Sequence, residues 1–148
     1  MPDFIKLPSE RVEQLRILSK NREIPIADLI GEFINDQIAK GHLSHDIPGV
    51  AVTRKGDVVT VDMGEFSRAM SPDLAQAYAT CLQWMATPRS AGMVGASRGA
   101  AQMVSGAHLV GIGRRGTSIR LTGENGAERT FAPSVARDLA KLVAKIAA

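Results

Sequence analysis

Two histidines and an aspartate lie close together in this sequence and could take part in metal binding. They are His42, His45 and Asp46, whereas the remaining histidine, His108, and the single cysteine, Cys81, are distant in sequence. A structural zinc ion takes four ligands in a tetrahedral arrangement. The cluster therefore needs a further ligand, and Cys81 falls on the apolar face of a predicted helix. We expect no metal site and no cofactor.

Three glycines imitate a dinucleotide-binding fingerprint. Gly111, Gly113 and Gly116 have the spacing G-x-G-x-x-G. That motif holds a pyrophosphate only where it follows a strand and opens a helix. Here the glycines lie in an alternating strand and its turn, and no helix begins after the last one. No Ser/His/Asp, Cys/His or paired-carboxylate arrangement has the spacing of a catalytic site. We therefore expect that the chain is not an enzyme.

Two pairs of basic residues occupy the turns of two predicted hairpins. The pairs are Arg54-Lys55 and Arg114-Arg115, each followed by glycine. Hairpin tips are exposed, so one interpretation is ordinary solvated charge. The other is a paired basic clamp on a nucleic acid backbone. Single-strand binding also needs exposed aromatic side chains for stacking, and only Phe66 and Phe131 lie on the predicted strands.

The second part of the sequence, residues 44–148, contains an internal repeat. Residues 50–86 and 108–148 each predict a hairpin, a third strand and a helix that opens on proline. Two such β-β-β-α units can pack as a pseudo-twofold pair, with all strands in one sheet and both helices on one face. Residues 87–107 are rich in Gly, Ala and Ser. They are either a flexible linker or contain a loose helix through residues 100–104.

The first part, residues 1–43, predicts a short strand and two helices. Residues 4–7 alternate as a strand does, Pro8 ends it, and Ser9 is a natural N-cap for a helix that continues to about Arg22. A second helix starts near Pro25 and ends at Lys40-Gly41. Chains below roughly 40 residues seldom fold without an added constraint, and a lone strand has unpaired edges. Two chains that pair their strands would satisfy both needs.

The run Ile5-Lys6-Leu7-Pro8-Ser9-Glu10, followed by Leu15, Leu18 and the second helix from Asp28, resembles the ribbon-helix-helix family of DNA-binding proteins. The resemblance covers residues 1–41. It implies an intertwined dimer whose paired strands enter the DNA major groove. The dimer core would consist of Ile5, Leu7, Leu15, Leu18, Leu29, Ile30, Phe33 and Ile34.

The same resemblance assigns the residues that would contact DNA. The base-facing positions of the ribbon would be Pro2, Phe4 and Lys6, of which only Lys6 matches the polar side chains usual in the family. Candidate phosphate contacts are Arg11 and Arg22, together with the backbone N–H groups of Ile26 and Ala27 at the start of the second helix. Pro25 at this corner has no N–H to donate.

These observations predict an α+β protein with an N-terminal ribbon-helix-helix domain, residues 1–43, and a duplicated β-β-β-α domain, residues 44–148. The function they favour is a cytoplasmic, homodimeric regulator that binds palindromic double-stranded DNA. The second domain would drive further homo-oligomerisation or bind an effector or a partner protein. The alternative is a non-catalytic interaction or antitoxin-like protein that uses the first domain only to dimerise. Residues 1–43 carry six basic and seven acidic side chains, against twelve and eight in residues 44–148. No apolar run is long enough to span a membrane.

Overall fold

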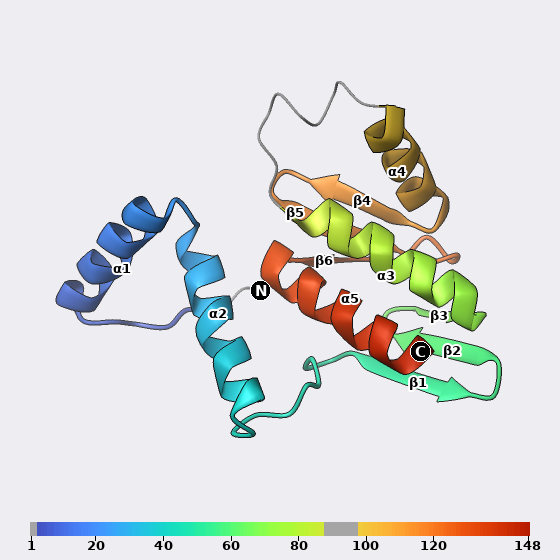
Figure 1. Cartoon of the computed structure of the whole chain (residues 1–148), viewed down its shortest axis with the longest axis horizontal. Coiled ribbons are helices and arrows are strands. Elements are labelled where there is room, and N and C mark those ends of the chain that lie inside the picture. The colour runs from blue at the N-terminus through green and yellow to red at the C-terminus, as the bar shows by residue number, and fades with distance from the viewer. Residues whose placement is uncertain (1–2, 88–97) are drawn as a thin grey trace. The chain divides into compact units, whose positions relative to one another are not determined.

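The computed structural model describes residues 3–87 and 98–148 of the chain. The chain divides into two compact units, Met1–Ser44 and His45–Ala148. Figure 1 shows the helices and strands of each unit, and the units are considered separately below.

The first unit is a pair of helices. Helix α1 spans Ser9–Arg22 and helix α2 spans Ile26–Ala39, and each follows a proline that occupies its N-cap position. Glu23 ends α1 in the left-handed conformation, with φ at 55°. The Ser19 hydroxyl donates a hydrogen bond to the carbonyl of Ile24 at 2.6 Å, which holds the turn between the helices. Ser9 is thus the first residue of α1 and not its cap.

The predicted strand over residues 4–7 is wrong. Residues 3–8 have no regular secondary structure, and the side chains of Phe4 and Ile5 are 93% and 86% exposed. A strand needs a second strand to accept and donate its backbone hydrogen bonds, and this unit contains no other strand within its described residues. The first unit is therefore a helix-helix hairpin, and the predicted β-α-α arrangement is not observed.

The second unit has the predicted order of elements within each repeat, three strands and then a helix. The first repeat comprises β1 Ala51–Lys55, β2 Val58–Asp62, β3 Ser67–Met70 and α3 Pro72–Ala86. The second comprises β4 Ile112–Arg115, β5 Ser118–Thr122, β6 Glu128–Phe131 and α5 Pro133–Ala147. A further helix, α4 Arg98–Leu109, precedes β4. For residues 87–107 the sequence allows two alternatives, a flexible linker or a loose helix, and a helix forms in part of this segment.

The six strands form two antiparallel sheets and not the single sheet that was predicted. Their orders are β1-β2-β3 and β4-β5-β6. Arginine side chains connect the two repeats where a backbone ladder is absent. Arg68 of β3 donates to the carbonyl of Thr122 at 3.2 Å, and Arg129 of β6 donates to that of Met63 at 3.1 Å. These two arginines occupy the same place in the two repeats, so the contacts are reciprocal.

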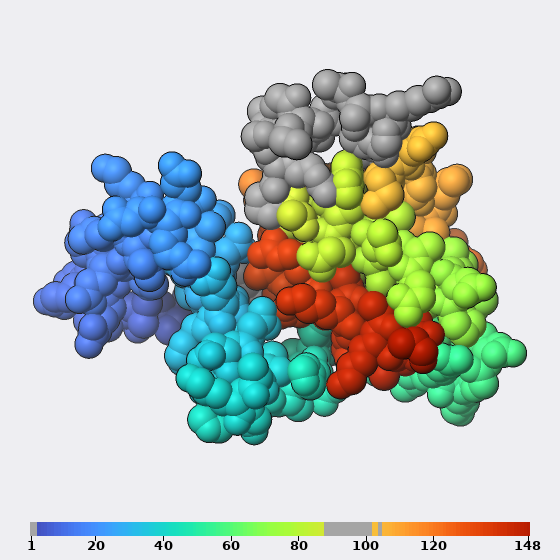
Figure 2. All heavy atoms as spheres, in the orientation of Figure 1, coloured from blue at the N-terminus to red at the C-terminus, as the bar shows by residue number. Residues whose placement is uncertain are grey.

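The core lies between the sheets and the helix pair α3 and α5, which cover one face of the strands (Figure 1). Alternation along β2 and β5 turns Val59, Val61, Ile119 and Leu121 inward, and all four are fully buried. Helix α3 contacts β4 of the other repeat, and α5 contacts β1. Each helix is thus packed on the hairpin of the opposite repeat. The outer surfaces of both helices are visible in Figure 2.

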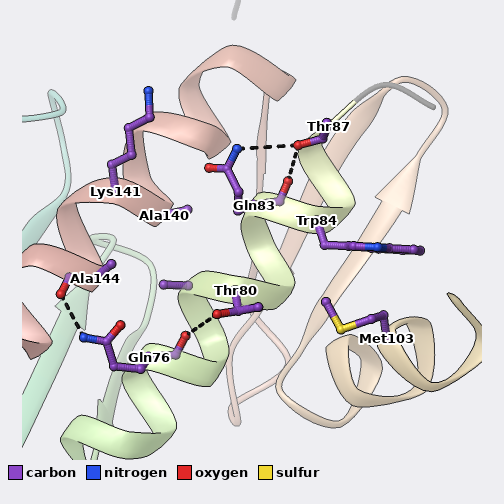
Figure 3. Close-up of a pocket in the computed structure, with 10 residues that line it drawn as sticks. Gln76, Thr80, Gln83, Trp84, Thr87, Met103, Ala140, Lys141 and Ala144 are labelled. Carbon is purple, nitrogen blue, oxygen red and sulfur yellow. Dashed lines mark hydrogen bonds between the residues drawn. The ribbon is translucent and has the colours of Figure 1, made fainter. Parts of the chain in front are cut away.

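Helices α3 and α5 run antiparallel and exchange equivalent hydrogen bonds. Gln76, near the start of α3, donates to the carbonyl of Ala144 near the end of α5 at 3.0 Å (Figure 3). Arg137, near the start of α5, donates to the carbonyl of Ala86 at the end of α3 at 2.7 Å. Tyr78 of α3 lies in the core below them, and burial raises its pKa to about 12.

Position 111 requires a glycine, because of its backbone conformation and because another chain segment lies close to it. Its φ is +78°, and a Cβ at this position would lie 2.4 Å from the carbonyl oxygen of Thr122. The two residues are also joined by a hydrogen bond from the Thr122 N–H to the Gly111 carbonyl, at 2.8 Å. The first glycine of the G-x-G-x-x-G pattern therefore serves a close approach of two chain segments.

We predict that Gly111→Ala lowers the free energy of unfolding by roughly 3 kcal/mol or more, because strain at positive φ is added to a clash with backbone atoms. Gly56→Ala is the matched control, since Gly56 has a φ of +58° and open space at its Cβ position. The control should cost about 1 kcal/mol. Urea unfolding measures both values, and equal losses for the two variants would contradict this explanation.

Candidate functional site

The first unit exposes most of its large apolar side chains and encloses a hollow between its two helices. The hollow has a volume of about 470 Å³. Its apolar lining consists of Leu15, Leu18, Leu29, Ile30 and Phe33. Leu29 alone among the unit's described large apolar residues is buried, whereas the Phe33 side chain is 60% exposed. The hollow is therefore a surface groove with an apolar lining, and we call it the hairpin groove.

The residues that the sequence assigned to a dimer core separate into two groups. Five of them line the hairpin groove together. Ile34 does not line it and is exposed, and Ile5 and Leu7 lie exposed in the segment that precedes α1. Within one chain these residues do not form a core, because two short helices offer too little surface to cover them.

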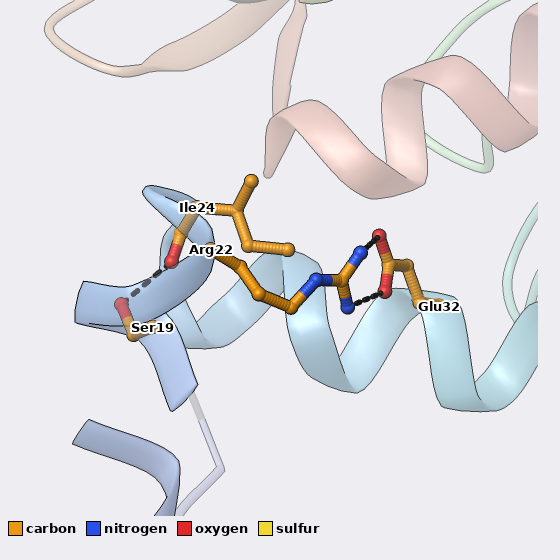
Figure 4. A network of polar contacts seen from close by, with 4 residues as sticks. All are labelled: Ser19, Arg22, Ile24 and Glu32. Carbon is orange, nitrogen blue, oxygen red and sulfur yellow. Dashed lines mark hydrogen bonds and ion pairs between the residues drawn. The ribbon is translucent and has the colours of Figure 1, made fainter. Parts of the chain in front are cut away.

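An ion pair forms part of the lining of the hairpin groove. The guanidinium group of Arg22 donates to both carboxylate oxygens of Glu32, at 2.6 and 3.1 Å (Figure 4). The hydrogen bonds and charge of Glu32 raise the pKa of Arg22. Sequence reasoning treated Arg22 as a phosphate contact and missed this pairing, which becomes visible only when the two helices fold against each other. The guanidinium group is occupied by a carboxylate in this structure.

The other positions assigned to DNA contacts lie apart from the hairpin groove. Pro2 is outside the described residues, whereas Phe4 and Lys6 are exposed in the segment before α1. Arg11 donates to the Oε1 atom of Gln14 at 2.9 Å on the surface of α1. Ile26 and Ala27 open α2, as expected, and Asp28 places a negative charge in the same first turn. A carboxylate there competes with a phosphate for the positive end of the helix.

In the second unit, one arginine of each basic pair caps a helix of the opposite repeat. Arg54 donates to the carbonyls of Ala147 and Ala148 at 3.0 and 2.9 Å, at the end of α5. Arg114 donates to the carbonyl of Met85 at 2.7 Å, near the end of α3. The last carbonyls of a helix have no partner within the helix. The two arginines therefore satisfy carbonyls at helix ends, a role that neither interpretation of the basic pairs included.

The second residue of each pair remains at the hairpin tip. Lys55 is exposed, and Arg115 is exposed with an ion pair to Glu128 at 3.3 Å. The difference between the two members of a pair follows from the alternation of a strand. Arg54 is two residues from Val52, which packs against the core, whereas Lys55 lies on the opposite face. This parity was the signal in the sequence that could have identified the capping arginines.

No group of three or more His, Cys, Asp or Glu side chains that could hold a metal ion occurs within residues 3–87 and 98–148. Cys81 is partly buried, and burial raises the pKa of its thiol, which disfavours the thiolate that binds metals. No helix among the described residues is long and apolar enough to cross a membrane.

Comparisons of the chain with protein-family models, with curated proteins and with solved structures found no match.

We predict that Arg114→Ala lowers the free energy of unfolding by about 1–2 kcal/mol, because it removes a charged hydrogen-bond donor from the end of α3. Arg115→Ala is the matched control, since the neighbouring side chain makes only an exposed ion pair, and it should cost less than about 0.5 kcal/mol. Chemical unfolding of both variants measures the difference. A larger loss for Arg115→Ala would show that the assignment is reversed.

Proposed function

We propose that this chain is a non-catalytic, self-associating regulatory protein, and that two copies pair through their hairpin grooves. The observation that supports this most directly is the burial of the first unit. Leu29 is its only buried large apolar residue among those described, while Phe33, Ile30 and Leu18 are exposed beside it. Exposed apolar groups grouped on one face are typical of an interaction surface.

The energetics of so small a unit favour association. Ordering each residue costs about 1–2 kcal/mol of backbone conformational entropy, which must be offset mainly by apolar burial. The two helices bury little apolar surface on their own. Pairing with another molecule would cover the groove and supply the missing burial, so that folding and association of this unit become linked.

A second copy of the same chain fits this surface better than an unrelated partner that is strongly acidic or strongly basic. The lining of the hollow includes the exposed side chains of Ile30 and Phe33, so that each copy can place these apolar groups against those of the other. A twofold pairing requires this kind of self-complementary surface. The rim contains one positive and one negative group, Arg22 and Glu32, and the unit carries nearly balanced charge. Neither copy would therefore repel the other strongly.

We predict that Phe33→Ala weakens self-association by at least about tenfold, since truncation of a central aromatic side chain in an interface commonly costs 2 kcal/mol or more. Sedimentation equilibrium of the full chain over a range of concentrations measures the dissociation constant. Ile17→Ala provides the control, because Ile17 is an exposed apolar residue of α1 that does not line the hairpin groove. A wild-type chain that is monomeric at high micromolar concentration would overturn the proposal.

A second candidate function, binding of double-stranded DNA by the dimer as a cytoplasmic regulator, is favoured by one observation. Lys6 and Phe4 lie exposed in a segment outside the helices. A twofold dimer would carry two such segments, and two-fold symmetry in a protein matches the symmetry of a palindromic operator. The occupied guanidinium group of Arg22 and the acidic first turn of α2 count against the phosphate contacts at that corner. An antitoxin-like role without DNA is the alternative within the same self-association proposal.

We predict that the full chain selects a palindromic sequence from a library of random duplexes, and that Lys6→Glu lowers the affinity for the selected duplex at least tenfold. Lys20→Glu makes the same charge change at an exposed position of α1 and should have a smaller effect. Affinity should fall as salt concentration rises, because phosphate contacts release counterions. If the chain binds no duplex from the library at low salt, DNA binding is excluded and self-association remains as the function.

A further inference from the structure

A second hollow lies on the outer side of the helix pair in the second unit. Helices α3, α5 and α4 border it, and its volume is about 420 Å³. The apolar part of its lining consists of Ala79, Trp84, Met103, Ala140 and Ala144 (Figure 3). Small-molecule pockets commonly have volumes of 300–1,000 Å³ and mostly apolar walls. We call this hollow the α3–α5 groove.

The α3–α5 groove exists because the crossing helices carry small side chains at their contact. Ala79 and Ala140 are buried where the two helices meet. These alanines allow the backbones to approach but fill little space on the outer side. The larger side chains of Trp84 and Met103 stand on the α4 side of α3, across that helix from Ala140 and Ala144 (Figure 3). The result is an apolar floor that is bounded by an aromatic ring and a thioether, both of which adapt well to apolar ligands.

The polar side chains around the α3–α5 groove, with one exception, form hydrogen bonds to groups of α3 and α5 or to Thr87. The hydroxyl groups of Thr80 and Thr87 donate to the carbonyls of Gln76 and Gln83, at 3.0 and 2.6 Å. The amides of the two glutamines donate to the Ala144 carbonyl and to the Thr87 hydroxyl. Lys141 also lines the groove, is exposed, and forms no hydrogen bond or ion pair with the part of the chain that the structure describes.

We infer that the α3–α5 groove binds a small monocarboxylate with an apolar body, such as a medium-chain or aromatic acid. The apolar part would lie on the alanine floor against Trp84, and the carboxylate would pair with the ammonium group of Lys141. Among the described lining residues, a single cation with no described partner stands beside an apolar floor, which favours one negative charge on the ligand, since a charge-assisted hydrogen bond is roughly twice as strong as a neutral one. Binding of such an effector goes beyond the self-association proposed above.

The charges on α5 support this choice of sign. Lys145 lies one turn after Lys141, and Asp138 lies one turn before it. Arg137 adds a further positive charge, although its guanidinium group is engaged with the carbonyl of Ala86. On α3, Asp73 is the acidic residue, and it lies at the start of the helix away from the groove lining. The local excess is therefore positive, which favours an anion over a neutral or cationic ligand.

The test uses the fluorescence of Trp84, which is the only tryptophan in the chain and lines the groove. The full chain is titrated with decanoate below its micelle concentration, and with decanol as the uncharged counterpart. We expect a saturable change in tryptophan emission with decanoate. We also expect decanol to bind at least tenfold more weakly, and Lys141→Ala to weaken decanoate binding at least tenfold.

Lys145→Ala is the control, because it removes the same charge from the same helix at a position that does not line the groove. It should change decanoate affinity by less than threefold, and far-UV circular dichroism should show that both variants keep the wild-type fold. Emission that does not saturate, equal binding of decanol, or unchanged affinity in Lys141→Ala would each overturn the proposal. An equal loss in Lys145→Ala would also overturn it. All described lining residues belong to the second unit, so failure here does not affect the proposed self-association.

Discussion

The close crossing of α3 and α5 is the contact on which the second unit depends. Ala75 and Ala79 on one helix, and Ala136 and Ala140 on the other, occupy the same places in the two repeats and are all buried. Side chains of this size let the helices approach, and each helix can then reach the hairpin of the opposite repeat. The same alanines leave the outer hollow beside Trp84. A single packing requirement thus determines both the core and the one groove of this unit that we propose as a ligand site.

In the first unit, by contrast, most large apolar side chains are not buried. Its helices contain apolar side chains in the spacing of one face, yet within one copy these residues have nothing to pack on except one another. The Arg22–Glu32 pair and the Ser19 hydrogen bond hold the turn, but exposed ion pairs and single hydrogen bonds contribute only about 1 kcal/mol each. The unit resembles half of an interface more than a finished domain, and self-association gives this face a role that a solvated surface does not explain.

Much of the second unit could be predicted from sequence because its signals are local. Alternation along residues 58–62 and 118–122, and the prolines that open α3 and α5, act within a few residues. The division into two sheets could not be predicted, because it depends on side chains such as Arg68 and Arg129 that reach between repeats. The strand over residues 4–7 was wrong for a related reason. Local alternation suits a strand, but pairing needs a partner strand, which residues 3–8 lack. Among the candidate sites, the exposure of Lys6 could be predicted from its place near the start of the sequence. The partner of Arg22 lies in the next helix, and the partners of Arg54 and Arg114 lie far along the chain, so these contacts depend on the fold.

The exchange of arginine caps between the repeats has a consequence for how the second unit opens. Arg54 belongs to the first hairpin but holds the end of the last helix, and Arg114 does the reverse. Neither repeat can therefore detach without uncapping a helix in the other and exposing the alanine crossing. Amide protons in both halves should become accessible to solvent through the same opening event, as one cooperative unit. The duplication has in this way produced a single folding unit from two copies of one motif.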